Sequence, residues 1–328
     1  MKWYSFVQKY FGLFFAVGLT LGLIFPDFFI PVAGRVMLIL STVMTLVFLS
    51  VDLKAAVANL KKFHNIALVF LITKAVLPFL LFHLFKPFGT EIAMAVLLLS
   101  LTPFAAISPT LTKILKGDTE FILLVQIIMT LTAPLYMPFL IFLIAGAEIE
   151  LNILQMMKTL VFLILIPFGI SLVIRPLFPG AVKKTKKYFG AVTILLIALL
   201  ITGLIAGAAA PITAEPLKAL PMTGISVLLA VILILSGWFG FFFLDRKKRI
   251  GISVSNLYMN IGLAAVVASG FFSDTVVLFV LIYELPSNLL PQLLGRLKFM
   301  RPDDSGGGDS GDRTGGSMGG TPERGGKD

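Results

Sequence analysis

The sequence predicts an all-α polytopic membrane protein with ten transmembrane helices, arranged as two inverted repeats of five helices each. Composition is the first indication of this fold class. Hydrophobic residues make up 58% of the 328 residues, charged residues make up 13%, and the mean hydropathy is +0.99. Soluble domains carry about 25% charged residues. The other two observations are the order of apolar and basic segments along the chain and a matched pair of polar interruptions.

Apolar stretches of about 20 residues, the length that crosses a bilayer, recur along the whole chain. In order they are 7–26, 31–50, 64–85, 91–112, 119–146, 153–177, 188–210, 222–244, 250–271 and 275–295. The first begins like a signal peptide, with Lys2 and Lys9 before an apolar run. That run ends at Phe25-Pro26-Asp27 without a small-residue cleavage site. We therefore interpret it as a retained helix.

The basic residues lie between the predicted spans with a strong bias in side. If ten spans alternate in direction, only Arg35, Lys86, Lys158 and Lys218 fall on one side, and nearly all other Lys and Arg residues fall on the opposite side. Cytoplasmic loops are the ones enriched in Lys and Arg. The net charge of +10 is therefore a topology signal and not a sign of nucleic-acid binding. It predicts a protein of the cytoplasmic (inner) membrane with both termini in the cytoplasm and the lipid bilayer as its partner.

The boundary between the two repeats is expected near 147–152, where Ala147-Glu148-Ile149-Glu150 would form a short external loop. Residues 1–147 then contain the first five spans and residues 148–300 the second five. An odd number of spans per repeat turns the second copy upside down relative to the first. Residues 301–328 are Gly, Ser and charged residues, which predicts a disordered cytoplasmic tail.

Two helix-breaking interruptions lie inside the fourth and the ninth span, at corresponding places in the two repeats. They are Pro103–Thr110 and Ser253–Gly262. Irregular backbone at membrane depth must be buried in protein or line a water-filled cavity. A matched pair of interrupted spans is typical of the binding site of a secondary transporter. We therefore expect six substrate-binding residues: Ser108, Pro109, Thr110, Asn256, Asn260 and Gly262.

The fourth span has a specific chemistry because proline cannot donate a backbone hydrogen bond. Pro103 should free the carbonyl of Leu99, and Pro109 should free that of Ala105. Together with Ser108 and Thr110 these carbonyls would form a hard-oxygen cluster, and the restarted half-helix would aim its positive end at an anion. The alternative is a proline kink that only shapes packing.

The ninth span carries amides that would be poor choices facing lipid. Asn256 and Asn260 share a face if the helix is intact between them, and Gly262 would allow close backbone approach. The alternative is that each Asn makes an interhelical hydrogen bond worth about 0.6 kcal/mol.

Lys74 and Glu284 are an acid and a base at similar depth, in the middle of spans three and ten. A lysine at mid-bilayer costs about 3 kcal/mol even on the insertion scale, so it must face protein or water. The two side chains are candidates to pair. Functionally, Lys74 would stand in for a sodium ion, or the pair would exchange a proton during transport. The alternative is a static ion pair that sets helix register.

These residues lead to a family resemblance. The fourth span carries Pro103, Ala105, Ala106 and Ser108, then Lys116-Gly117-Asp118; the fifth carries Pro134 and Pro138; the ninth reads Asn260-Ile261-Gly262-Leu263-Ala264. Over residues 7–298 the chain resembles the bile acid:sodium symporter family. The resemblance implies a core domain of spans 3–5 and 8–10, which holds two crossed broken helices, against a panel domain of spans 1, 2, 6 and 7.

The chain departs from that family at most positions that hold sodium. Aligned with the family's sodium ligands are Pro109, Ile122, Gln126, Ser255, Met259 and Thr73, and only Ser108 keeps the family side chain. Sodium coupling therefore does not carry over directly, although a weak sodium site near Ser108 and Ser255 is compatible with the resemblance. The candidate ion-coupling residues are Lys74, Glu284, Gln126, Thr130, Ser255 and Thr73.

The predicted function is secondary-active transport of a small organic anion, such as a bile-acid-like, steroid or small carboxylate substrate, by alternating access. Sodium or a proton is the candidate coupling ion, and no other cofactor is expected. Rivals are a proton-coupled or uncoupled exporter of the auxin-carrier type and a membrane ligand sensor. The arsenite exporters that resemble this fold use a cysteine, and the chain has none. It shows no nucleophile and base constellation, so an enzyme is not expected.

Overall fold

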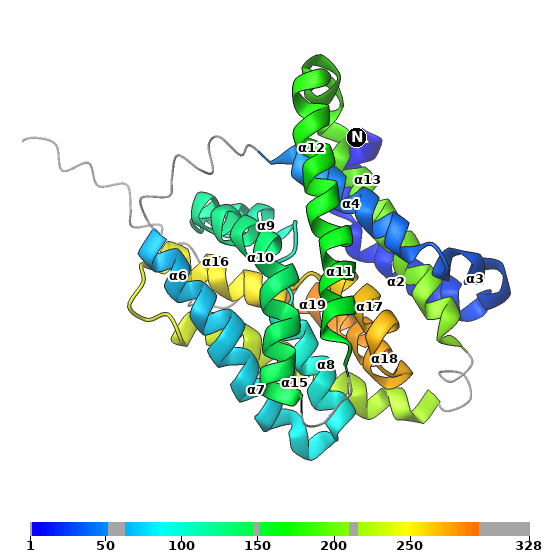
Figure 1. Ribbon diagram of the computed structural model, residues 1–328, viewed down its shortest axis with the longest axis vertical. Helices are drawn as coiled ribbons and strands as arrows, with labels where there is room; N and C mark the ends of the chain where they lie inside the picture. Colours follow the sequence, from blue (N-terminus) through cyan, green and yellow to red (C-terminus); the bar gives the residue numbers. More distant parts are fainter. Residues whose placement is uncertain (1, 52–62, 147–150, 210–215, 295–328) are drawn as a thin grey trace, which may run out of the picture.

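The computed structural model describes residues 2–51, 63–146, 151–209 and 216–294 (Figure 1). Within these ranges the secondary structure is helical, and the only β-type pairing is an isolated antiparallel bridge between Phe104 and Met259. Five helices are long and apolar enough to cross a membrane, or up to seven if two bent helix pairs each count as one span. The predicted tail at 301–328 and the predicted loop at Ala147–Glu150 lie outside the described residues.

The helices pack in two groups (Figure 1). The first contains α1 (Trp3–Lys9), α2 (Phe11–Ile24), α3 (Pro26–Ala33), α4 (Val36–Ser50), α12 (Ile166–Leu177) and α13 (Pro179–Gly207). The second contains α6 (Phe63–Leu71), the π-helix η2 (Ile72–Val76), α7 (Leu77–Phe85), η3 (Lys86–Phe88), α8 (Thr90–Leu101), α9 (Ser108–Ile114), α10 (Thr119–Ala145), α15 (Pro216–Phe239), α16 (Arg246–Leu257), α17 (Ile261–Phe271), α18 (Asp274–Ile282) and α19 (Glu284–Leu294). Helix α11 (Ile153–Leu160), with the π-helix η4 (Val161–Leu165), leads into α12 and also packs against α10 of the second group.

Each of the ten predicted apolar segments coincides with helix, but several are not single straight spans. The first is bent by 77° between α1 and α2, and the second by 65° between α3 and α4. The fourth, ninth and tenth are pairs of shorter helices. Helix α13 begins at Pro179, before the predicted start at 188, because the basic stretch that precedes the apolar run is also helical.

Small residues bring the helices of the first group together. A Cβ added at Gly18 on α2 would lie 2.8 Å from the carbonyl oxygen of Ala198 on α13, and one at Gly22 would lie 2.6 Å from that of Thr202. Within a membrane, helices associate through such close backbone contact, because lipid tails supply no hydrophobic drive between them. The glycines of α2 therefore fix its packing on α13.

The ends of α2 and α12 have the same backbone geometry. Phe25 follows α2 with φ −123° and ψ 55°, and Phe178 follows α12 with φ −130° and ψ 53°. Each amide donates to the carbonyl four residues earlier, and each is followed by a proline that starts the next helix, Pro26 or Pro179. The same local sequence thus produces the same turn at two places far apart in the chain.

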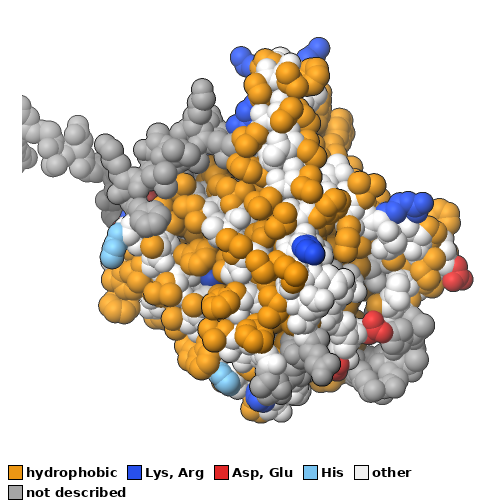
Figure 2. Space-filling model, in the orientation of Figure 1, with side chains coloured by type: hydrophobic (Ala, Val, Ile, Leu, Met, Phe, Trp, Pro, Cys, Tyr) orange, Lys and Arg blue, Asp and Glu red, His pale blue; other side chains and the backbone are white. Residues whose placement is uncertain are grey.

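The outer surface is predominantly apolar. Figure 2 shows hydrophobic side chains over most of the visible face, with Lys and Arg side chains mainly near its edges and at the upper end where α12 meets α13. Large apolar side chains are freely exposed, among them Phe28 at 77%, Phe242 at 75% and Leu220 at 73%. Such a surface is suited to lipid and not to water.

Candidate functional site

The two interrupted spans meet at one point inside the second helix group. Helix α8 ends at Leu101 and α16 ends at Leu257, and the extended segments that follow them run antiparallel to each other. The amide of Ala105 donates to the carbonyl of Tyr258 at 2.8 Å, and the amide of Asn260 donates to that of Pro103 at 2.9 Å. Each break therefore satisfies backbone groups of the other, as irregular backbone at this depth requires. We call residues 102–107 and 258–260 the crossing.

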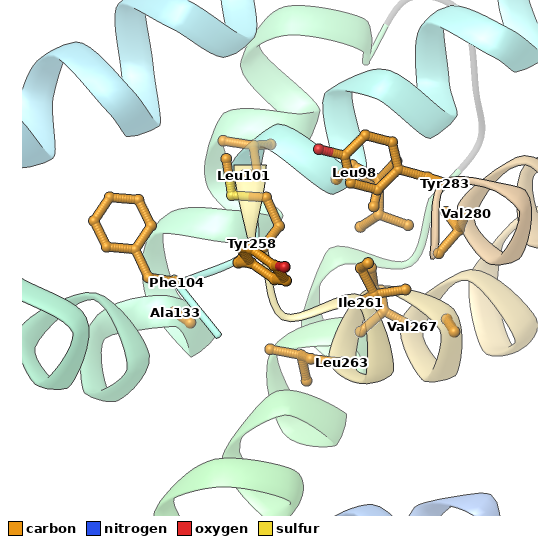
Figure 3. Packing of buried hydrophobic residues seen from close by; sticks show 14 of the residues in the cluster. Leu98, Leu101, Phe104, Ala133, Tyr258, Ile261, Leu263, Val267, Val280 and Tyr283 are labelled. Atoms are coloured by element: carbon orange, nitrogen blue, oxygen red, sulfur yellow. The ribbon is translucent and has the colours of Figure 1, made fainter. Parts of the chain in front are cut away.

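Apolar side chains from both segments surround the crossing. Phe104 and Tyr258, one from each segment, lie near its centre, and Tyr283 approaches from the neighbouring helix (Figure 3). Phe104 is fully buried and Tyr258 nearly so. The exposed residues lie at one end of the first break, where Ala106 and Thr110 are open and Pro109 between them is buried. Within the crossing, Ala106 is therefore exposed and Asn260 is half-buried.

The carbonyls at the end of α8 all have donors, and this corrects the expectation that proline leaves them free. The hydroxyl of Thr102 donates to Leu99 at 2.7 Å, and the amide of Thr102 reaches Leu98 at 3.1 Å. The carbonyl of Ala105, expected to be freed by Pro109, accepts the amide of Ser108 at 3.0 Å. Prolines remove one donor, but the chain turns so that a nearby hydroxyl or amide replaces it.

The last carbonyls of α8 are bound by side chains from other helices. The ammonium of Lys74 donates to the carbonyls of Ser100 at 3.0 Å and Thr102 at 2.5 Å. The hydroxyl of Tyr136 on α10 donates to the carbonyl of Leu101 at 2.8 Å. The ammonium also lies 3.6 Å from the sulfur of Met259 and 5.2 Å from the centroid of the Phe104 ring. A positive charge thus sits at the negative end of the half-helix.

The second break resembles the first in one respect and differs in another. The hydroxyl of Tyr283 donates to the carbonyl of Leu257 at 2.9 Å, as Tyr136 does at the first break. The carbonyl of Tyr258 accepts the hydroxyl of Ser108 at 3.3 Å in addition to the amide of Ala105. Among the described residues, no ammonium or guanidinium binds the end of α16.

The two asparagines of the ninth span do not share a face, because the helix breaks between them. Asn256 lies in α16 and donates to the hydroxyl of Ser236 on α15 at 3.1 Å, so it makes an interhelical bond. Asn260 precedes α17 and caps it, because its side-chain oxygen accepts the amide of Leu263 at 3.1 Å. Gly262 does not make a close approach, since an added Cβ would meet nothing nearer than 3.8 Å.

Glu284 and Lys74 do not pair. Glu284 lies at the start of α19 and accepts a hydrogen bond from the side-chain amide of Asn288 at 2.9 Å. Among the described residues, neither forms a salt bridge, and the three contacts of the Lys74 ammonium are two carbonyls and a sulfur. The physical reason is that the end of α8 already supplies oxygen acceptors beside the ammonium, so no carboxylate is needed there.

The other predicted ion-coupling residues are buried but only partly bonded. The hydroxyls of Thr73 and Thr130 donate to the carbonyls four residues earlier, Val69 and Gln126. The oxygen of the Gln126 side chain and the hydroxyl of Ser255 have no partner among the described residues. Ser255 lies on α16, which packs against α10, the helix that carries Gln126.

Sequence reasoning missed the two tyrosines, although a signal for them exists. Tyr136 lies between Pro134 and Pro138 in an apolar span, and Tyr283 directly precedes Glu284. A buried phenol hydroxyl needs an acceptor, and an interrupted helix provides unpaired carbonyls. The sequence could therefore have predicted that each tyrosine binds a carbonyl at a break, but not which carbonyl it binds.

Comparison with known proteins places the chain among transporters. The sequence profile of the Sodium Bile acid symporter family matches residues 37–215. A protein of Bacillus subtilis named as an uncharacterized sodium-dependent transporter, YocS, is 24% identical over 206 residues. That similarity covers 62% of this chain and 64% of the length of the relative. The matched profile includes Lys74, the first break and α10, and it ends before the second break.

Proposed function

The chain belongs to the sodium bile acid symporter family, and we propose that it is a secondary-active transporter that moves an organic anion across the cytoplasmic membrane by alternating access. The observation that carries the proposal is the crossing of two broken helices through the backbone bonds of residues 103–105 and 258–260. Discontinuous helices of this kind hold the substrate and the coupling ion in secondary transporters.

We further propose ten spans in two inverted repeats, with a core of spans 3–5 and 8–10 and a panel of spans 1, 2, 6 and 7. Two pairs of matching features support this arrangement. Tyr136 and Tyr283 each donate to the last leucine of a broken half-helix. Phe25 and Phe178 end the first span of each repeat with the same backbone angles. A two-fold relation between the repeats accounts for both.

An anion is the substrate class that suits the electrostatics of the crossing. Helix α17 begins there and presents the positive end of its dipole. The ammonium of Lys74, from η2, binds the carbonyls of Ser100 and Thr102 at the other segment, with no carboxylate bonded to it among the described residues. Ser108 and Asn260 supply polar groups beside these charges. The substrate would approach past Ala106 and Thr110, which are exposed.

Transport with proton coupling is the second candidate, and Glu284 is the observation that favours it. The residue is buried, with 6% exposure, and among the described residues its carboxylate is bound by an amide and not by a cation. A buried acid of this kind can take up and release a proton as a cavity opens and closes. Sodium coupling is favoured instead by the name of the Bacillus subtilis relative.

Counterflow in proteoliposomes is the direct test of transport. Vesicles containing the purified protein are loaded with an unlabelled organic anion, and entry of the labelled anion is followed for bile acids, steroid acids and small carboxylates. We expect saturable counterflow for at least one class. A protein that binds an anion in a thermal-shift screen but gives no counterflow with it would be a membrane ligand sensor, and the transport proposal would then fail.

A matched pair of variants tests the crossing itself. Asn260 and Asn152 each cap the N-terminus of a helix by accepting a backbone amide, at 3.1 and 2.9 Å, but only Asn260 lies at the crossing. Each change to Leu should cost about 1 kcal/mol of stability through the lost cap. We expect Asn260→Leu and Ser108→Leu to abolish counterflow and Asn152→Leu to keep it. Equal counterflow activity in the three variants would show that the substrate does not bind at the crossing.

The orientation is tested with single cysteines, since the native chain contains none. The proposed topology places position 148 outside the cell and positions 186 and 247 in the cytoplasm. An impermeant maleimide added to intact cells should label Glu148→Cys and leave Lys186→Cys and Lys247→Cys unlabelled until the cells are opened. The reverse pattern would invert the protein in the membrane.

A further inference from the structure

Lys74 is a fully buried lysine within a membrane span. It is 0% exposed and belongs to the π-helix η2, and the neighbouring Thr73 is buried as well. In a regular α-helix, adjacent residues point about 100° apart, and single π-helical turns occur frequently at functional sites. The local widening of the helix therefore accompanies two consecutive inward-facing polar residues.

Among the described residues the ammonium has three hydrogen-bonding partners, and none of them is acidic. An ammonium has three N–H donors, and the three contacts are the carbonyls of Ser100 and Thr102 and the sulfur of Met259. The ring of Phe104 adds a cation–π contact at 5.2 Å. Every one of these groups belongs to α8 or to the crossing. The charge is therefore stabilised by backbone dipoles and a ring.

Free carbonyls at the end of a broken half-helix are the groups that bind a sodium ion or proton in secondary transporters. Here the same class of group, at the same kind of place, binds an ammonium that is attached to the chain. We propose that the Lys74 ammonium is a built-in cation that occupies this carbonyl site permanently, so that the protein neither binds nor needs sodium there. The inference rests on the proposed transport function, but it is tested by the binding of sodium to the purified protein and not by transport.

A purely structural lysine is the competing explanation. Such a lysine would only neutralise the carbonyls of the break, and the space it leaves on removal would have no affinity for a metal ion. The two explanations differ in one measurable respect. If the carbonyls of Ser100 and Thr102 form a cation site, a small residue at position 74 should open that site to sodium.

The experiment measures thermal unfolding of the purified full-length protein in sodium chloride and in choline chloride at equal ionic strength. The wild type should unfold at the same temperature in both salts. Lys74→Ala should unfold at a lower temperature in choline, and sodium should raise its Tm saturably, by about 5 °C or more at concentrations far above the Kd. Potassium, which is larger, should be less effective.

Lys74→Met is the matched control, because its unbranched side chain fills the space of the lysine stem without a charge or an oxygen ligand. It should be destabilised in both salts, with no sodium effect. If Lys74→Ala is recovered folded from sodium but not from choline, that is itself the expected rescue. Lys74→Ser, which adds an oxygen ligand, provides a second variant in which to see the sodium effect.

Three results would overturn the proposal. One is a saturable sodium effect on wild-type stability that Lys74→Ala abolishes, because the site would then not be filled by the lysine. Another is equal sodium stabilisation of Lys74→Ala and Lys74→Met. The third is the absence of any sodium effect or rescue in both Lys74→Ala and Lys74→Ser. Failure of counterflow in the wild type leaves all of these readings intact, so the two proposals can fail separately.

Discussion

At both broken helices a tyrosine hydroxyl binds the last helical carbonyl, but the two breaks differ in the charged side chains beside them. Helices α8 and α16 both end at a leucine, Leu101 and Leu257, whose carbonyl accepts a tyrosine hydroxyl at 2.8 or 2.9 Å. At the first break a lysine ammonium binds two further carbonyls. At the second break the described partners are neutral, and the acid Glu284 follows Tyr283 directly in the chain.

This difference separates two features of a broken helix: the pairing of its backbone carbonyls and the presence of a charged side chain beside them. At the end of α16 the carbonyl of Leu257 accepts the hydroxyl of Tyr283, and that of Tyr258 accepts the amide of Ala105, so these two carbonyls are paired by neutral donors. A mid-membrane lysine costs about 3 kcal/mol, and among the described residues a lysine binds only one of the two breaks.

The largest effect is expected from removing the charge at the first break. Lys74→Met leaves the carbonyls of Ser100 and Thr102 without donors, and each buried unsatisfied group costs about 1–3 kcal/mol. Stability in detergent should fall by about 3 kcal/mol, and anion counterflow should be lost. Lys158→Met, an exposed lysine on α11, is the control and should change neither. A fully active Lys74→Met would make the charge irrelevant.

A more selective effect is expected from the acid beside the second break. Glu284→Gln keeps the size of the side chain and can still accept the bond from Asn288, so the fold and counterflow should persist. Accumulation driven by an imposed pH gradient should be abolished if this carboxylate carries the proton. Glu91→Gln, on the exposed first turn of α8, is the control. Unchanged pH-driven accumulation in Glu284→Gln would show that this carboxylate does not carry a coupled proton.

The similarity of the breaks is tested by removing one hydroxyl from each. Tyr136→Phe and Tyr283→Phe each leave one leucine carbonyl unsatisfied without changing the packing of the ring. Both variants should lose about 1–2 kcal/mol, measured as a decrease in Tm under the same conditions. A large loss in only one of them would show that the two breaks are not equivalent.

The smallest effect is expected at Gly262, in the first turn after the second break. An added Cβ there meets nothing nearer than 3.8 Å, whereas one at Gly237 on α15 would lie 2.3 Å from the Cα of Ser253 on α16. Gly262→Ala should be close to neutral, and Gly237→Ala should lose about 1–3 kcal/mol by overpacking. Thermal unfolding of both variants decides this. A strongly destabilised Gly262→Ala would contradict the open geometry at the break.

The sequence by itself determined that the chain is helical and apolar and that the fourth and ninth spans are broken. The breaks are shorter than predicted, because Ser108–Thr110 belongs to α9 and Ser253–Leu257 belongs to α16. Hydropathy over about 20 residues is a local property, so apolar segments such as 119–146 and 153–177 coincide closely with Thr119–Ala145 and with the helical stretch from Ile153 to Leu177. Pro103 lies at the first break, but a missing amide alone does not decide a break, because Pro134 and Pro138 lie inside the continuous helix α10. The bends within the first two spans had no comparable signal that we recognised.

Only the tertiary structure decided the partners at the candidate site. Glu284 was a reasonable partner for Lys74 on depth alone, yet the ammonium binds carbonyls 26 and 28 residues along the chain. Asn260 became a helix cap and Asn256 an interhelical donor because the helix breaks between them. These outcomes depend on which helices lie side by side and at what rotation. Pairing between residues such as 103 and 260 leaves no periodicity in the sequence, so it appears only once the helices are packed.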